Sequence, residues 1–415
     1  MRFKRVGGMA LLCGAAMLAV PAYAQSNQAG VDVSTTAEMT SNPYLNSSSG
    51  RMIGAGSVEI RPWLKRESAT DSLTLEGFAR LRAFTEQYKL EDSYGGTLRA
   101  TSRLSQTTSA YGTLGIISSS ARTLLNNFGR LPVVTAPLNP VDPIPTLPPG
   151  ENLNLIGLAG RSTSLDLQSG IDHGLDPRSS VGARVGYQKV MNQNPRAADF
   201  DRASFGLSYS YLLSDRTTIG LGANASRARF DGDYPDSTTV DVYGSLNYRA
   251  AQYFTLSASA GVAVTSTTAS RFGPGDSKLY GVGSADACYR RTDQSMCLSV
   301  SRAQQPSMLG GVRTQTSVAA SLGQRLGARV RMDMSGTYAR SGAVDSSVPA
   351  AAQLAAAIDQ LSLRATITRS FTDRIDGYLF SSVSRIYDDS NINGFSRKPS
   401  IAFGAGLRVR LGTRQ

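Results

Sequence analysis

The stretch that most constrains this chain is 401–411, which has the sequence IAFGAGLRVRL. From Ile401 to Leu411 every second residue is apolar, and the residues between them are small or, at Arg408 and Arg410, basic. Side chains of a β-strand alternate between its two faces, so the stretch predicts a strand with one apolar face and one polar, cationic face. Its length suits a tilted strand that crosses a bilayer. A half-buried strand of a soluble sheet would have the same pattern, so the choice depends on whether the pattern repeats.

The alternation does repeat along the chain, and long apolar runs typical of buried core strands are missing. Clear examples are 31–39, 73–83, 165–172, 181–188, 203–211, 254–264, 326–335, 361–368 and 401–411, with less regular ones at 52–64, 94–105 and 109–120. Counting strands gives about 18, with 16 as the alternative, and an even number is expected when both ends of a barrel lie on one side. We therefore predict an all-β fold, a transmembrane antiparallel up-and-down β-barrel.

The predicted connections between these strands alternate in length. Short turns are expected at 176–178, 214–216, 292–293 and 372–374, and longer loops at 192–199, 231–236, 267–278, 341–359 and 387–399. Within the loop 341–359, Pro349 precedes an Ala-rich run that could form a short helix. Short turns at one end and long loops at the other are typical of bacterial outer-membrane barrels.

The first 24 residues have the features of an export signal. A basic segment at 1–5 precedes an apolar run at 6–20 and the motif Ala22-Tyr23-Ala24. Cys13 lies inside the run, but Leu12 stands where a lipid-attachment motif needs a small residue. We predict a signal peptide at 1–24, a barrel at 25–415 and a location in the outer membrane of a Gram-negative bacterium.

Residues 121–160 interrupt the alternation. Prolines recur from Pro132 to Pro149, which excludes a central strand or a long helix there. We predict a long outer loop, either exposed to solvent or folded into the pore as a constriction.

The chain is basic, with a formal net charge of +12 and a single histidine, His173. The basic residues are mostly arginines spaced singly along predicted strands, which together with export argues against a nucleic-acid partner. An anionic solute or the phosphates of outer-leaflet lipid fit better. One histidine near a predicted turn is a poor basis for catalysis, and no metal or cofactor motif is present. We therefore predict no enzymatic activity and no cofactor.

In an 18-stranded barrel the lumen is too wide for side chains to fill, so the polar face of each strand lines a channel or a plugged interior. The pore-lining candidates are Glu76, Arg80, Arg82, Arg99, Arg103, Arg184, Arg249, Arg329, Arg331, Asp333, Arg364, Arg408 and Arg410, with Asp166, Asp172, Asp241 and Asp286 on the same face. These charges could simply pair across strands, or they could make a positive pore that favours anions. Arg227 and Arg229 fall on the opposite, outward face, where they could meet lipopolysaccharide phosphates.

Two cysteines give a sharp local prediction. If Thr292-Asp293 is a hairpin turn, Cys288 lies directly opposite Cys297 in a non-hydrogen-bonded pair, where side chains approach most closely. Because the expected compartment is oxidising, we predict a cross-strand disulfide, with two free thiols as the alternative.

The export signal, the early strand leading into Thr40-Ser41-Asn42-Pro43, the strand rhythm and the last strand together resemble outer-membrane β-barrels of the porin type. That group includes barrels associated with exopolysaccharide production. Gly406, Val409 and Leu411 are similar to the signal recognised by the barrel-assembly machinery, although four residues follow where an aromatic end is usual. The resemblance implies a channel that passes or exports hydrophilic, anionic solutes, with a link to polysaccharide export. The alternative is a non-conducting structural or assembly barrel plugged by the Pro-rich loop.

Overall fold

The computed structural model describes residues 26–43, 51–85, 90–120, 161–194, 197–232, 234–269, 275–307, 311–342, 357–388 and 398–412. They form one antiparallel sheet of 18 strands. The strands are β1 (Ser26–Ser41), β2 (Met52–Glu67), β3 (Asp71–Phe84), β4 (Glu91–Arg103), β5 (Thr108–Ser120), β6 (Arg161–Gly174), β7 (Ser179–Asn192), β8 (Phe200–Ser214), β9 (Thr217–Phe230), β10 (Ser237–Ala251), β11 (Phe254–Thr267), β12 (Ser277–Arg290), β13 (Gln294–Pro306), β14 (Val312–Arg325), β15 (Val330–Ser341), β16 (Ile358–Ser370), β17 (Ile375–Asp388) and β18 (Ser400–Gly412). No helix in these ranges is long and apolar enough to cross a membrane.

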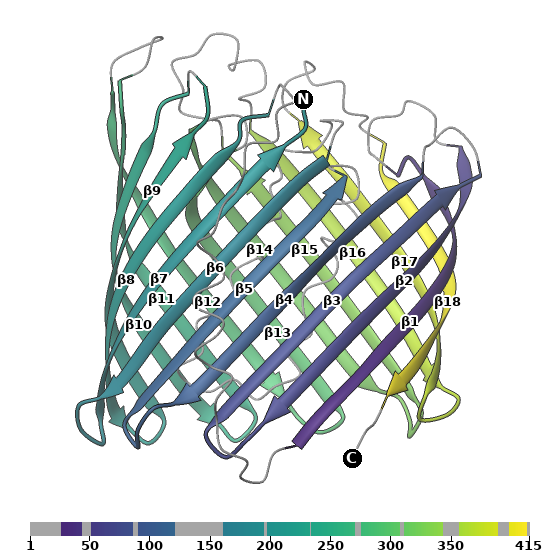
Figure 1. Cartoon of the computed structure of the whole chain (residues 1–415), viewed down its shortest axis with the longest axis horizontal. Helices are drawn as coiled ribbons and strands as arrows, with labels where there is room; N and C mark the ends of the chain where they lie inside the picture. The colour runs from purple at the N-terminus through teal and green to yellow at the C-terminus, as the bar shows by residue number, and fades with distance from the viewer. Residues whose placement is uncertain are drawn as a thin grey trace.

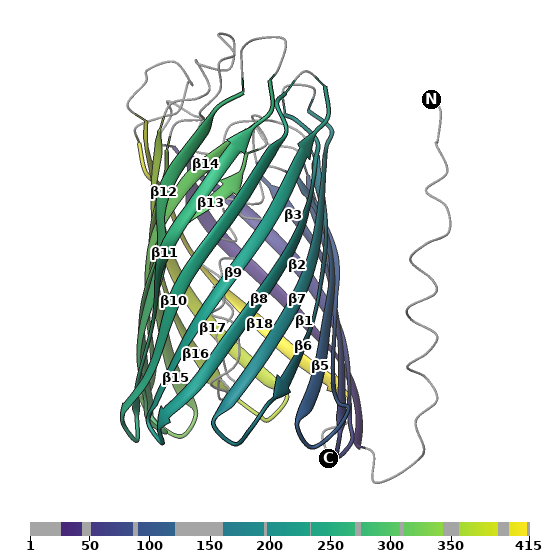
Figure 2. The same cartoon turned by 90° about the vertical axis from the view of Figure 1, so that its left-hand side faces the viewer.

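The sheet closes on itself, because β1 pairs with both β2 and β18. Gly30 lies opposite Gly412 and Ser41 lies opposite Ile401, so the first and last strands match over most of their length. Every other strand pairs with its neighbours in sequence, which gives the tilted cylinder seen in Figures 1 and 2. The chain is thus a closed up-and-down barrel of 18 strands, and the predicted fold class is confirmed.

The two ends of the barrel differ as the sequence predicts. Tight turns such as 175–178 and 291–293 gather at one end, together with the first and last described residues (Figure 1). The strand ends that border the long connections lie at the opposite end. We call these the short-turn end and the long-loop end.

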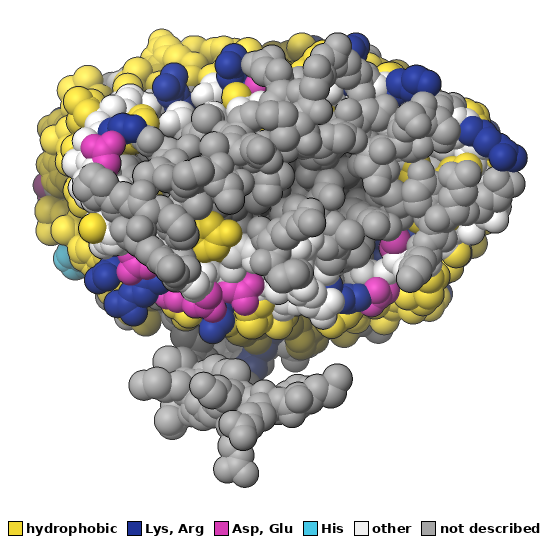
Figure 3. All heavy atoms as spheres, turned by 90° about the horizontal axis from the view of Figure 1, so that it is seen from above, with side chains coloured by type: hydrophobic (Ala, Val, Ile, Leu, Met, Phe, Trp, Pro, Cys, Tyr) yellow, Lys and Arg dark blue, Asp and Glu magenta, His cyan; other side chains and the backbone are white. Residues whose placement is uncertain are grey.

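The outward faces of the strands carry an exposed apolar surface. Large side chains such as Leu221, Leu279 and Phe403 have more than half of their surface exposed, at 66%, 68% and 53%. Viewed along the barrel axis, hydrophobic side chains run around the outside of the molecule (Figure 3). Apolar exposure on this scale is unusual for a protein in water, and it suits a surface covered by lipid.

One sequence expectation changes in detail, and three lie outside the described residues. The second strand does not end at Trp63: β2 continues to Glu67 although Pro62 lies within it. Proline has no N–H to donate, and the ladder to β3 is interrupted at residues 61–62, next to Gly77. The signal at 1–24, the loop at 121–160 and the Ala-rich run that begins at Pro349 lie outside the described residues.

Candidate functional site

The polar face that points into the barrel is the candidate site. Strand register fixes its members, because residues opposite one another on neighbouring strands share a face. The faces that bear Leu81, Tyr94 and Phe403 are exposed to the outside, so the alternate residues of β3, β4 and β18 line the lumen.

The register places most of the predicted pore-lining residues on this lumen face. They are Glu76, Arg80, Arg82, Arg99, Arg103, Arg184, Arg249, Arg331, Asp333, Arg364, Arg408 and Arg410. Asp166, Asp172, Asp241 and Asp286 share it. The assignment of Arg329 to a strand was wrong: β15 begins at Val330, and Arg329 is an exposed residue of the turn before it. The N–H of Leu326 donates to the carbonyl of Val330 at 2.9 Å to close that turn, and the carbonyl of Arg329 accepts from the N–H of Ser370 on β16 at 2.9 Å, so Arg329 lies at the edge of the ladder.

Sequence reasoning overlooked several carboxylates that face these arginines. On β17, β18 and β1 to β4, which we call the ionic wall, the cations Arg61, Arg80, Arg82 and Arg410 share the lumen face with Asp32, Glu38, Glu59, Glu91 and Asp376. The alternation that identified the arginines also contains these acids, so they could have been found by extending it to the strand ends and across Pro62.

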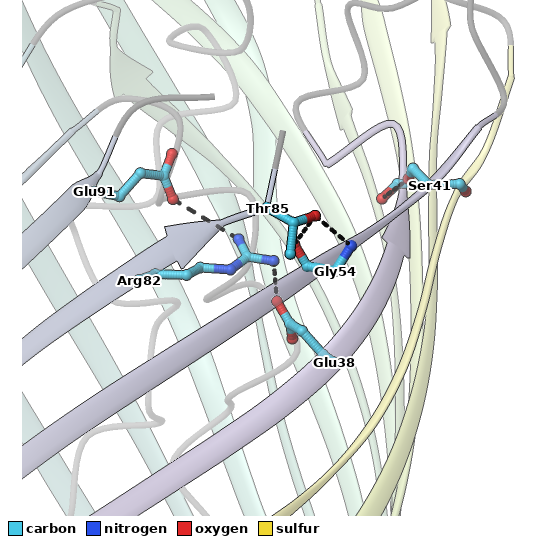
Figure 4. Close-up of polar contacts among 7 residues, drawn as sticks. Glu38, Ser41, Gly54, Arg82, Thr85 and Glu91 are labelled. Atoms are coloured by element: carbon cyan, nitrogen blue, oxygen red, sulfur yellow. Dashed lines mark hydrogen bonds and ion pairs between the residues drawn. The ribbon is translucent and has the colours of Figure 1, made fainter. Parts of the chain in front are cut away.

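The ionic wall contains a buried cluster of charged side chains at the long-loop end. Arg82 on β3 donates a hydrogen bond to Glu38 on β1 and lies 3.8 Å from the Glu91 carboxylate on β4 (Figure 4). The three side chains are 2%, 8% and 5% exposed. Strand β2 lies between β1 and β3, and its lumen-facing residues here are small: Ala55 is opposite Glu38, and Ser57 is opposite Arg82. Arg82 can therefore reach across β2 to Glu38.

Further pairs neutralise other cations of the lumen face. Arg410 donates to Asp376 on β17, which is 1% exposed, and Arg331 binds Asp333 at 2.8 Å. Arg61 pairs with Glu59 on the same strand. Part of the lumen charge is therefore engaged in ion pairs, on the ionic wall and on β15.

Three lumen arginines differ from these. Arg99, Arg103 and Arg408 are exposed, and none of them forms an ion pair with a carboxylate of the described residues. All three lie toward the short-turn end of their strands. This is the part of the lumen where an unneutralised positive charge can act on a passing ion.

Aromatic side chains lie flat against the ionic wall. The ring of Tyr378 on β17 lies over Gly406 of β18, where an added Cβ would meet the ring at 2.3 Å, and its hydroxyl reaches Thr36 on β1 at 2.5 Å. Trp63 covers Gly30 and Phe78 covers Gly95 in the same way. These glycines let large rings lie along the wall rather than project into the lumen.

The two cysteines lie as the hairpin register predicts. Cys288 on β12 is opposite Cys297 on β13, with their Cα atoms 4.2 Å apart, and the two are joined by a disulfide. The N–H of Arg291 donates to the carbonyl of Gln294 at 2.7 Å, which closes the turn.

The remaining predicted residues lie apart from any cluster with catalytic geometry. His173 is exposed at the short-turn end, with Nδ1 2.9 Å from the hydroxyl of Thr108. Within the described residues, no group of three or more His, Cys, Asp or Glu side chains could hold a metal ion. Arg227 and Arg229 face outward near the long-loop end, and Arg227 pairs with Asp236 at 3.3 Å.

No protein-family model and no curated protein matches this chain. Among solved structures, the FrpB iron transporter of Neisseria meningitidis is similar, with 10% identity and a TM-score of 0.45 over 89% of this chain and 64% of that one. This chain therefore spans about two thirds of the length of FrpB. OccK2 of Pseudomonas aeruginosa has 9% identity and a TM-score of 0.44, covering 93% and 98% of the two chains. OprD of the same organism has 10% identity and a TM-score of 0.42, covering 93% and 94%. At these identities the likeness concerns the barrel shape alone.

Proposed function

We propose that this protein is an outer-membrane channel for hydrophilic solutes, with a preference for anions. The observation that carries the proposal is the contrast between the two faces of a closed barrel. The outer face is apolar and exposed, whereas the inner face is polar and charged. A spanning sheet must close so that each backbone group is paired, and 18 strands leave an interior wider than side chains can fill.

The proposed anion preference depends on a small set of residues. Because most ionic-wall arginines face a carboxylate, we assign the preference to Arg99, Arg103 and Arg408 at the short-turn end. Under the proposed location this end faces the periplasm, and Gly406, Val409 and Leu411 of β18 serve as the signal for the barrel-assembly machinery.

A salt gradient across a planar bilayer tests both parts of the proposal. The wild-type protein should conduct, and its reversal potential should show anion selectivity. The triple variant Arg99→Gln, Arg103→Gln, Arg408→Gln should shift the reversal potential toward cations. Arg229→Gln, which removes an outward-facing arginine, is the matched control and should leave selectivity unchanged. A conducting but cation-selective wild type would defeat the assignment to these arginines, and absence of conductance would favour the plugged-barrel alternative.

The finer part of the proposal, a role in polysaccharide export, is supported by sequence resemblance alone. Deletion of the gene should then lower the surface polysaccharide of the bacterium, measured as released hexose, and the wild-type gene should restore it. Unchanged polysaccharide would remove this part and leave the channel intact.

A further inference from the structure

Strands β12 and β13 separate from each other at the long-loop end of the barrel. These strands pair only from Gly283 opposite Arg302 to Arg290 opposite Ser295. β13 nevertheless continues to Pro306 and stays paired with β14 as far as Val312. Beyond Arg302, no ladder pair of the described residues joins the β13–β14 hairpin to β12.

Burial along β13 changes at the same point. Met296, Leu298 and Val300 face outward and are 47%, 49% and 40% exposed. Gln304 lies on the same face of the strand, yet it is only 7% exposed, and Pro306 is also buried. The face of β13 that is exposed on the outside of the barrel from Met296 to Arg302 is therefore buried beyond Arg302.

The covering surface is the lumen face of strands farther along the sheet. One small cavity is lined by Gln304, Pro306 and Val312 of the hairpin and by Arg202, Ser226, Ala228, Ser237 and Thr239 of β8 to β10. These residues of β8 to β10 alternate with outward-facing ones such as Val240, so they point inward. The cavity's volume of about 10 Å³ leaves room for at most about one water molecule, so the hairpin and the wall are closely packed. We call residues 303–307 and 311–314 the inward hairpin end, because they lie inside the barrel against β8 to β10.

An apolar surface next to this contact explains why the hairpin docks there. Val190, Phe200, Ala228 and Phe230 face the lumen and form a buried cluster with Ala197 and Ala198 of the β7–β8 connection. Ala228 belongs to this cluster and also lines the cavity beside Pro306 and Val312. Burial of apolar surface favours this contact, and Gln304 donates to Thr314 at 2.8 Å to hold the two hairpin strands together.

We propose that the inward hairpin end is the constriction that sets the size limit of the channel. The inference rests on the proposed channel function. An element docked on one wall narrows the lumen from that side, so solutes must pass between it and the opposite wall. Arg202 donates to Ser226 at 3.2 Å, which holds its guanidinium on the wall next to the hairpin.

The position of the hairpin can be tested without any measurement of transport. Gln304→Cys combined with Thr239→Cys places one thiol on the hairpin and one on the lumen wall. A short bifunctional maleimide should link them in the folded protein, and protease digestion followed by mass spectrometry would show the linked peptides. Val300→Cys with Thr239→Cys is the control, because Val300 faces outward, and it should give no link. A linked control or an unlinked Gln304 pair would overturn the inward position.

Shortening the hairpin tests the constriction itself. Replacing residues 304–314 by Asn-Gly leaves Ala303 opposite Gln315, a pair already in register, across a two-residue turn. The control replaces 267–276 by Asn-Gly, which leaves Ser266 opposite Ser277. Heat-modifiable migration on gels verifies that both variants fold. The first variant should show a severalfold rise in single-channel conductance and admit larger sugars in liposome swelling, and the control should match the wild type.

The outcomes separate the two proposals. Unchanged conductance in the shortened hairpin variant would overturn the constriction and leave the channel in place. A silent wild type with a conducting shortened variant would support the constriction and contradict an open channel. If no variant conducts although the Gln304–Thr239 link forms, both proposals fail.

Discussion

Two parts of the lumen are built in opposite ways. The ionic wall, formed by β17, β18 and β1 to β4, carries long charged side chains that pair with one another. The wall formed by β8 to β10, which we call the docking wall, presents mainly Ser, Thr, Gly and Asn to the lumen, with Arg202 and Asp241 among its few charges. The first wall fills its own surface with side chains, and the second leaves room that a hairpin occupies.

The comparison shows that a charged side chain on the lumen wall attracts or repels a solute only if no opposite charge already neutralises it. A buried pair costs desolvation energy and compensates it by attraction, so its net field in the pore is small. The paired part of the ionic wall therefore contributes rigidity more than selectivity. The proposed selectivity falls to Arg99, Arg103 and Arg408, which pair with no carboxylate of the described residues, and the proposed size limit falls to the constriction on the docking wall.

The largest expected effect comes from breaking the buried cluster of the ionic wall. Arg82→Ala removes the cation that Glu38 and Glu91 share, and should lower the free energy of unfolding by about 3 kcal/mol. Urea unfolding in detergent micelles, followed by Trp63 fluorescence, measures the loss. Adding Glu38→Gln should restore part of the stability, because one buried carboxylate is then neutral. Equal stability of Arg82→Ala and the wild type would show that the cluster is solvated and that the ionic wall is not rigid.

The next effect concerns the strands beside the docked hairpin. β12 and β13 share the shortest ladder in the barrel, and the Cys288–Cys297 disulfide lies within it. The double variant Cys288→Ser, Cys297→Ser should lose up to about 2–3 kcal/mol of unfolding free energy, since the bond closes a short loop in the unfolded chain. Thiol labelling of the purified protein gives the direct check: labelling should require a reductant. Complete labelling without a reductant would mean that no disulfide joins β12 to β13.

A smaller loss of stability is expected from a substitution at Gly406, and it distinguishes a packing role of this glycine from a role in the assembly signal. An added Cβ would meet the Tyr378 ring at 2.3 Å and the carbonyl of Thr35 at 2.4 Å, so Gly406→Ala should cost roughly 1–3 kcal/mol. Gly281→Ala is the matched control, because no atom lies within 4 Å of its added Cβ. Refolding into micelles without the assembly machinery decides between the two roles. A defect of Gly406→Ala that appears only in cells would assign this glycine to the assembly signal instead.

Much of the barrel could be predicted because lipid and lumen impose a period of two on every strand. That single rule gave the strand count, the order of short and long connections, and the register of Cys288 against Cys297. It also placed Arg99 and Arg408 on the correct face. Closure then follows, because an open edge in lipid would leave backbone groups unpaired.

The rest depended on contacts between strands that are distant in sequence. Arg82 meets Glu38 across β2, and no local pattern tells which arginine finds a carboxylate two strands away. The inward hairpin end did leave a trace, since the apolar outward face of β13 stops after Val300. Arg302 and Gln304 follow on that face, but polarity alone gives no direction for the bend.

The smallest expected effect lies outside both walls, in the turn between β6 and β7. Hydrogen bonds from the Ser179 hydroxyl and from the backbone N–H groups of Arg178 and Ser179 hold the pKa of the Asp176 carboxyl below its ordinary value. A lowered pKa adds stability above the ordinary carboxyl pKa of about 4, and this stability is lost as pH falls through the lowered value. The stability difference between the wild type and Asp176→Asn should therefore be present at pH 7 and disappear toward pH 3 in urea unfolding series. Asp215→Asn removes the same charge from the next turn at this end and serves as the control. An equal and pH-independent effect of the two substitutions would mean that turn hydrogen bonds do not contribute, and that barrel stability comes from the walls alone.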